Sequence, residues 1–211
     1  MNQAARRVPR TGRGERTRDV LLDAAQEVFW KKGYLDARVA DIAALAGVSH
    51  GSFYTYFDSK EAVLRALAAD LHEGTVQTGR GTRAAAGGDE VRAIELANRR
   101  YLEFYVANRK AMRLMEEVAT YNPDMRKARL RTRMQFVERT ARSLRRMQHA
   151  GTCDPGLDVG TAAHALVGMV SSFAYHMVST RTPFDVDTAV ATLTTLWARG
   201  IGLDVPWGGA R

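Results

Sequence analysis

The chain has 211 residues, 45% of them hydrophobic, which is enough for one large folded domain or for a small domain joined to a larger one. It contains one cysteine and no stretch of about 18 to 20 uncharged apolar residues, so we expect no disulfide framework, no membrane span and a cytoplasmic location. The formal net charge is +8, and residues 74–157 alone hold 17 Lys and Arg against 9 Asp and Glu. This excess predicts an anionic partner such as nucleic acid.

Apolar residues recur at helical spacing along the chain, and strand patterns are nearly absent. We expect a basic flexible arm at 1–14, followed by a first helix over 15–32. A second, short helix is expected over 39–46, and it ends at Gly47, a residue that adopts a positive φ without steric cost.

The next segment carries two helix-start signals. Ser49 is a good N-cap for a third helix over 50–56. Asp58 followed by Glu61 is typical of a capping box at the start of a fourth helix. A loop or a frayed helix junction is then expected at 79–90.

The remaining chain repeats the pattern of amphipathic helices. Apolar faces occur over 91–105, 112–119, 123–144, 158–180 and 185–201. The sequence therefore predicts an all-α fold, with a DNA-binding unit of three helices at 15–60 and a larger helical domain at 61–211.

Two short helices joined by a glycine turn form a helix-turn-helix, whose second helix fits the major groove of DNA. At about 100° per residue, Phe53 and Phe57 share one face and would anchor this short helix. The opposite face is free for DNA, so we expect hydroxyl groups and helix N-terminal N–H groups to contact phosphates. A bound phosphate would also make a lysine favourable at the start of the fourth helix. The residues expected to contact DNA are Ser49, His50, Gly51, Ser52, Tyr54, Thr55, Tyr56 and Lys60.

The segment ARVADIAALAGVSHGSFYTYFDSKEAVLRAL, residues 37–67, resembles the DNA-binding signature of TetR-family transcriptional regulators. The resemblance extends over about 15–70 and includes the order and spacing of the glycine turn, the aromatic residues and Ser59-Lys60-Glu61. Members of that family often have Thr near positions 37 and 38, where its hydroxyl meets a phosphate. Here Ala37 and Arg38 stand instead, and we expect Arg38 to make that contact with its longer charged side chain.

This resemblance implies a homodimeric regulator, expected to be a repressor, that binds a double-stranded DNA operator and is released by a small lipophilic effector. The apolar stripes of the last two helices are wider than one packing face requires, which also favours a dimer. The resemblance implies an effector pocket in the middle helices, with these expected lining residues: Tyr101, Phe104, Tyr105, Met112, Met115, Met134 and Phe173.

The arginine-rich stretch 126–147 leaves three interpretations open. It is the solvated face of an amphipathic helix, a second surface for nucleic acid, or a site that receives an anionic effector such as a fatty acid or an acyl-CoA.

No catalytic constellation, cofactor motif or metal-ligand spacing occurs in the sequence, so we expect no enzyme, no cofactor and no metal. Two alternatives remain: a helical enzyme without a recognisable motif, and a constitutive DNA-binding regulator that has no effector.

Overall fold

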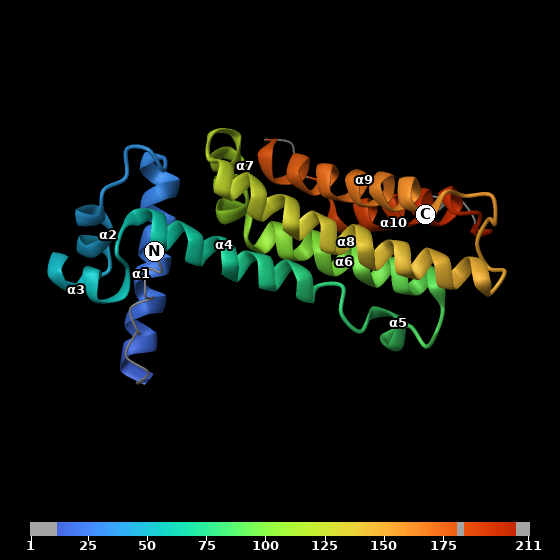
Figure 1. Cartoon of the computed structure of the whole chain (residues 1–211), viewed down its shortest axis with the longest axis horizontal. Helices are drawn as coiled ribbons and strands as arrows, with labels where there is room; N and C mark the ends of the chain where they lie inside the picture. Colours follow the sequence, from blue (N-terminus) through green and yellow to red (C-terminus); the bar gives the residue numbers. More distant parts are fainter. Residues whose placement is uncertain (1–11, 181–183, 206–211) are drawn as a thin grey trace, which may run out of the picture. The chain divides into compact units, whose positions relative to one another are not determined.

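The structure is a computed structural model that describes residues 12–180 and 184–205. Within these ranges the chain forms helices and no β-strand, which confirms the expected all-α fold (Figure 1). The helices are α1 (Gly12–Lys32), α2 (Val39–Leu45), α3 (His50–Tyr56), α4 (Lys60–Gln77), α5 (Thr82–Ala85), α6 (Glu90–Ala107), α7 (Arg109–Tyr121), α8 (Pro123–His149), α9 (Val159–Ser179) and α10 (Val186–Gly200).

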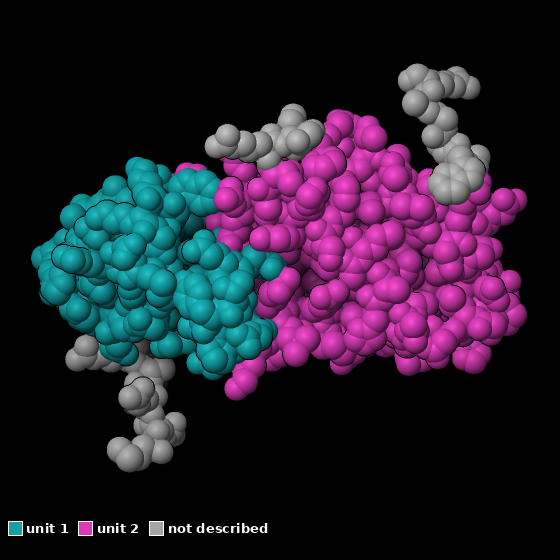
Figure 2. Space-filling model, turned by 90° about the horizontal axis from the view of Figure 1, so that it is seen from above, with its two compact units in different colours: residues 1–71, 114–126 teal, residues 72–113, 127–211 magenta. Residues whose placement is uncertain are grey.

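The chain divides into two compact units (Figure 2). The first contains the described residues up to Leu71 together with 114–126, and the second contains 72–113 and the described residues from Lys127 onward. This division differs from the boundary expected between residues 60 and 61, because the first half of α4 buries its apolar side chains in the core of the first unit. The assignment of DNA-binding and ligand-binding roles to particular ranges stays a prediction.

The core of the first unit gathers apolar side chains from α1 to α4, from α7 and from the start of α8. Leu21, Ile42 and Val63 are fully buried in it. Phe53 and Phe57 are 0% and 6% exposed, which confirms that they anchor α3. Burying one such side chain stabilises a fold by about 1.5–3 kcal/mol, so this core holds α3, which has too few turns to persist alone.

The second unit is built around α6, which packs against both α9 and α10. A hydrophobic cluster joins α6, α8 and α9 with the residue that follows α10, and includes Ile94, Leu144 and Ile201. Between α6 and α10, the amide of Asn98 donates a hydrogen bond to the hydroxyl of Thr194 at 3.1 Å, and both residues are buried. A buried polar pair of this kind fixes how the two helices align, because a shift would leave both groups unsatisfied.

The starts of two helices differ from the expected ones. Helix α1 begins at Gly12 instead of residue 15, and most of the expected basic arm, residues 1–11, lies outside the described residues. Helix α4 is capped by Ser59, whose hydroxyl accepts from the N–H of Ala62 at 3.2 Å, instead of by Asp58. The short helix α5 lies within the segment 79–90, which was expected to be a loop or a frayed helix junction.

The arginine-rich face of α8 is largely exposed to solvent, as the first of the three interpretations requires. Arg129, Arg133, Arg142 and Arg145 are exposed, whereas Arg139 is half-buried. In the part of the chain that the structure describes, no helix has the length and apolar character needed to cross a bilayer.

Candidate DNA-binding site

A tight turn joins α2 to α3. Gly47 has a φ of +67°, a backbone conformation that other residues adopt only with strain. Its N–H donates to the carbonyl oxygen of Ala44 at 3.2 Å, and the N–H of Val48 donates to that of Ala43 at 3.0 Å. This pair of bonds satisfies the last carbonyls of α2 and turns the chain directly into α3.

Ser49 is the N-cap of α3, as the sequence predicts. Its hydroxyl accepts a hydrogen bond from the N–H of Ser52 at 3.0 Å, and the two serine hydroxyl oxygens lie 2.8 Å apart. Both serine side chains therefore already take part in hydrogen bonds at the start of α3. A phosphate contact by either hydroxyl would add to these bonds.

The two faces of α3 differ in character. Phe53 is buried, whereas His50, Gly51, Tyr54 and Thr55 are exposed on the other side. The ring of Tyr54, 38% exposed, lies edge-on to those of His50 and Phe53, with centroid distances of 5.2 and 5.4 Å. These contacts hold an aromatic hydroxyl-bearing side chain on the outer surface of the helix.

Tyr56 is less available than the other residues expected to contact DNA. It is half-buried and packs against the core of the first unit. A DNA contact by Tyr56 would therefore involve its hydroxyl end and not its ring.

Arg38 is exposed at the N-cap position of α2. Its backbone N–H donates to the carboxylate of Asp41 at 3.2 Å, and Asp41 also pairs with Lys32 of α1 at 2.8 Å. The Lys32 ammonium, with this backbone bond, lowers the pKa of Asp41 below its usual value. Asp41 thus links the start of α2, where Arg38 stands, to the end of α1.

The ammonium group of Lys60 has partners inside the protein. It donates to the carbonyl oxygens of Tyr34, Leu35 and Ala37 at 2.9, 2.9 and 3.0 Å. It also lies 4.8 Å from the centroid of the Tyr34 ring. An ammonium has three N–H donors, so all three are used. This geometry favours a structural role for Lys60 over the expected phosphate contact.

Tyr34 and Glu61 complete this cluster, and the sequence reasoning did not single out either as a partner of Lys60. The Tyr34 hydroxyl donates to the Glu61 carboxylate at 3.2 Å. Burial, together with the negative charge of Glu61, raises the pKa of Tyr34. The cluster ties the segment before α2 to the start of α4, so it fixes both ends of the helix-turn-helix. Tyr34 lies 26 positions before Lys60, and no local sequence pattern indicates that the two residues are in contact.

The residues expected to line an effector pocket are not all in one unit. Met115 packs against the core of the first unit, whereas the other six belong to the second. The rings of Tyr101 and Tyr105 lie tilted against each other with their centroids 5.0 Å apart, and Tyr101 meets Phe136 edge-on at 5.5 Å. Phe104 packs against Gly74 of α4, where a Cβ would lie 2.6 Å from its ring atoms. Tyr101, Tyr105 and Phe136 form an aromatic cluster between α6 and α8. Phe104, Met112, Met134 and Phe173 stay predicted lining residues.

Across residues 12–180 and 184–205, no three His, Cys, Asp or Glu side chains gather in a way that would hold a metal ion. The exposed polar face of α3, carried by a buried aromatic anchor behind a glycine turn, defines a helix-turn-helix protein of the DNA-binding class.

Comparisons with known proteins agree with this class. The family described as "Bacterial regulatory proteins, tetR family" matches residues 21–67. The HTH-type transcriptional regulator TtgR of Pseudomonas putida is 41% identical over 59 residues, which are 28% of this chain and 28% of that relative. The chain therefore matches well under a third of that relative's length.

Similar solved structures extend over both units. FadR, a fatty acid degradation regulator from Bacillus halodurans, has a TM-score of 0.73 at 21% identity, covering 89% of this chain and 97% of that one. FadR from Bacillus subtilis, solved in complex with stearoyl-CoA, has a TM-score of 0.70 at 22% identity, covering 87% and 98%. The chain is therefore similar to TetR-family regulators, in sequence over residues 21–67 and in fold over both units.

Proposed function

We propose that this protein is a transcriptional repressor that binds a DNA operator as a homodimer and is released from it by a small lipophilic effector. The observation that carries the proposal is the division of α3 into a buried aromatic face and an exposed face with His50, Gly51, Tyr54 and Thr55. The outer face of α3 is exposed, so it is available for base edges and phosphates.

The dimer is proposed to form through α9 and α10. Leu196 is 42% exposed on α10, and Met169, Val170 and Phe173 are only half-buried on α9. Covering such apolar side chains in a second copy would stabilise the association. A two-fold dimer would present two copies of α3 to half-sites about 34–36 Å apart, or a multiple of that distance.

The effector is proposed to occupy the middle helices near the aromatic cluster of Tyr101, Tyr105 and Phe136. The basic charge of 74–157 favours a molecule with an apolar body and an anionic end, such as a fatty acid or an acyl-CoA. The structural likeness to FadR, which was solved with stearoyl-CoA, supports the same chemical class. A coupling of about 1–3 kcal/mol between the two sites would change operator affinity 5- to 150-fold.

The test begins with the selection of duplexes from a random DNA pool by the purified protein. We expect enrichment of an inverted repeat, followed by loss of binding when decanoate or decanoyl-CoA is added. If no sequence is enriched by the folded protein, the proposal fails. Enrichment without release by decanoate, decanoyl-CoA or neutral decanol would favour a constitutive regulator instead.

A further inference from the structure

Arg139 of α8 is a half-buried cation with few partners. Its guanidinium lies 4.6 Å from the centroid of the Phe136 ring. One Nη donates to the carbonyl oxygen of Val76 at 3.4 Å, which is beyond the usual length of such a bond. Among residues 12–180 and 184–205, no carboxylate lies within ion-pair distance of this guanidinium.

The position of the guanidinium depends on Gly79, just after α4. A Cβ at Gly79 would lie 1.9 Å from the nearest guanidinium nitrogen, so the absent side chain provides the room that Arg139 occupies. Phe136, which the guanidinium also contacts, meets Tyr101 edge-on, and the ring of Tyr101 lies tilted against that of Tyr105. The cation therefore stands at one end of the aromatic cluster between α6 and α8.

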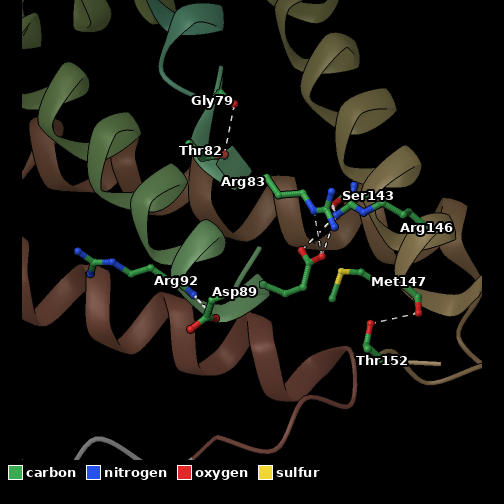
Figure 3. A network of polar contacts seen from close by, with 10 residues as sticks. Gly79, Thr82, Arg83, Asp89, Arg92, Ser143, Arg146, Met147 and Thr152 are labelled. Atoms are coloured by element: carbon green, nitrogen blue, oxygen red, sulfur yellow. Dashed lines mark hydrogen bonds and ion pairs between the residues drawn. The ribbon is translucent and has the colours of Figure 1, made fainter. Parts of the chain in front are cut away.

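The charges around Arg139 do not neutralise it. Arg83, at 3.3 Å, and Arg146, at 3.1 Å, both bind the carboxylate of Glu90 (Figure 3). Arg146 lies two turns along α8 from Arg139. Burial and the neighbouring Arg142 both lower the pKa of Arg139. Removing a cation from water without a countercharge is unfavourable. The arrangement becomes favourable once an anion is present.

We propose that the Arg139 guanidinium binds the carboxylate or phosphate group of the effector, whose apolar part lies against Tyr101, Tyr105 and Phe136. The planar fork of arginine donates two parallel hydrogen bonds to either oxyanion, and its ring contact with Phe136 holds that fork in place. The assignment rests on the proposed effector response, but binding at Arg139 can be measured without DNA.

The experiment compares Arg139→Gln with Arg145→Gln, which removes the same charge from an exposed position on the same helix. Calorimetry measures the binding of decanoate, decanoyl-CoA and decanol. We expect Arg139→Gln to weaken the binding of one or both anionic probes about 10- to 100-fold, because a charged hydrogen-bond partner is lost. Decanol should bind both variants as it binds the wild type. Loss with decanoate identifies a carboxylate ligand, and loss with decanoyl-CoA alone identifies a phosphate.

Two further readouts separate a binding role from a structural one. Without any ligand, Arg139→Gln should keep the melting temperature of the wild type, since it removes an uncompensated buried charge. Inorganic phosphate, compared with chloride at equal ionic strength, should raise the melting temperature of the wild type and of Arg145→Gln more than that of Arg139→Gln.

The assignment is overturned if Arg139→Gln binds both anionic probes like the wild type, or if it loses all three probes equally. It is also overturned if the wild type binds neither anionic probe and phosphate stabilises all three proteins alike. If the anions bind through Arg139 but never release a selected operator, the proposed effector response fails while the anion site stands.

Discussion

Lys60 contacts three carbonyl groups, and each belongs to a residue at least 23 positions earlier in the chain. We expect Lys60→Met, which keeps most of the aliphatic stem, to lower the free energy of unfolding by about 2 kcal/mol, because hydrogen bonds from a charged donor are lost. Denaturant titration measures this. Lys31→Met is the control, since Lys31 is exposed and pairs only within α1, and it should change stability by less than about 0.5 kcal/mol.

The salt dependence of DNA binding decides whether Lys60 also neutralises a phosphate. With its three donors engaged, we expect the slope of log K against log salt to be unchanged in Lys60→Met. A slope reduced by about one would show a phosphate contact and contradict a purely structural role.

Gly51 separates stability from DNA binding. It has a right-handed helical φ, and a Cβ there would meet only the Ser49 hydroxyl, at 3.9 Å. Gly51→Ala should raise the free energy of unfolding by about 0.5–1 kcal/mol, because Ala is the better helix former. If the backbone of α3 approaches DNA here, operator affinity should fall roughly tenfold, which corresponds to 1.4 kcal/mol. Unfolding curves and fluorescence anisotropy measure the two effects.

Gly47, in the turn before α3, should respond to alanine in the opposite way from Gly51. Because Gly47 has a φ of +67°, Gly47→Ala should instead destabilise the protein by about 1–2 kcal/mol.

For Gly51→Ala, an unchanged operator affinity would show that the backbone of α3 does not come close to DNA.

At the scale of the element, α3 depends on its cap. Ser49→Ala removes the acceptor for the Ser52 N–H and should cost about 1 kcal/mol of stability. Ser49→Asp keeps a good cap, so its unfolding free energy should stay near that of the wild type. A new negative charge next to a phosphate should nevertheless weaken operator binding more than Ser49→Ala does. Equal operator affinities for the two variants would argue against a phosphate at this helix start.

The helix boundaries that the sequence predicted well are those with local signals. Ser49, the aromatic spacing of Phe53 and Phe57, and the glycine turn all act within ten residues, so the bounds of α3 were predicted correctly. The start of α1 at Gly12 was missed, because its glycines are poor helix formers and no capping residue marks the position. For α4, Asp58 and Ser59 are both good caps, and only the structure distinguishes them.

For the whole molecule, the proposed binding of an inverted-repeat operator requires a dimer of the 23.3 kDa chain. We expect Leu196→Glu to shift the mass measured by light scattering from dimer to monomer, because it places a charge in the proposed interface. Leu130→Glu is the control, since Leu130 is 58% exposed on α8 and lies outside that interface. A Leu196→Glu protein that stays dimeric at micromolar concentration would place the interface elsewhere.

Contacts between distant segments set the limit of what the sequence could predict. The basic composition of 126–147 indicated an exposed face, and most of its arginines are exposed. The burial of Arg139 depends on Val76 and Gly79, at least 60 positions away, and no local pattern reveals that packing. The expected lining residue Met115 packs in the first unit, because α7 is divided between the two units after Arg113.

The exposed face of α3 is proposed to read DNA, and replacing the Tyr54 side chain gives the sharpest test of that proposal. The measurement is the affinity of wild type and Tyr54→Ala for the selected duplex, at several salt concentrations, with melting temperature and mass measured in parallel. We expect Tyr54→Ala to bind roughly tenfold or more weakly with an unchanged salt slope, since a neutral contact of about 1–3 kcal/mol is lost. Its stability and dimer mass should match the wild type. Equal affinity of the two proteins at every salt concentration would contradict the placement of α3 in the DNA groove.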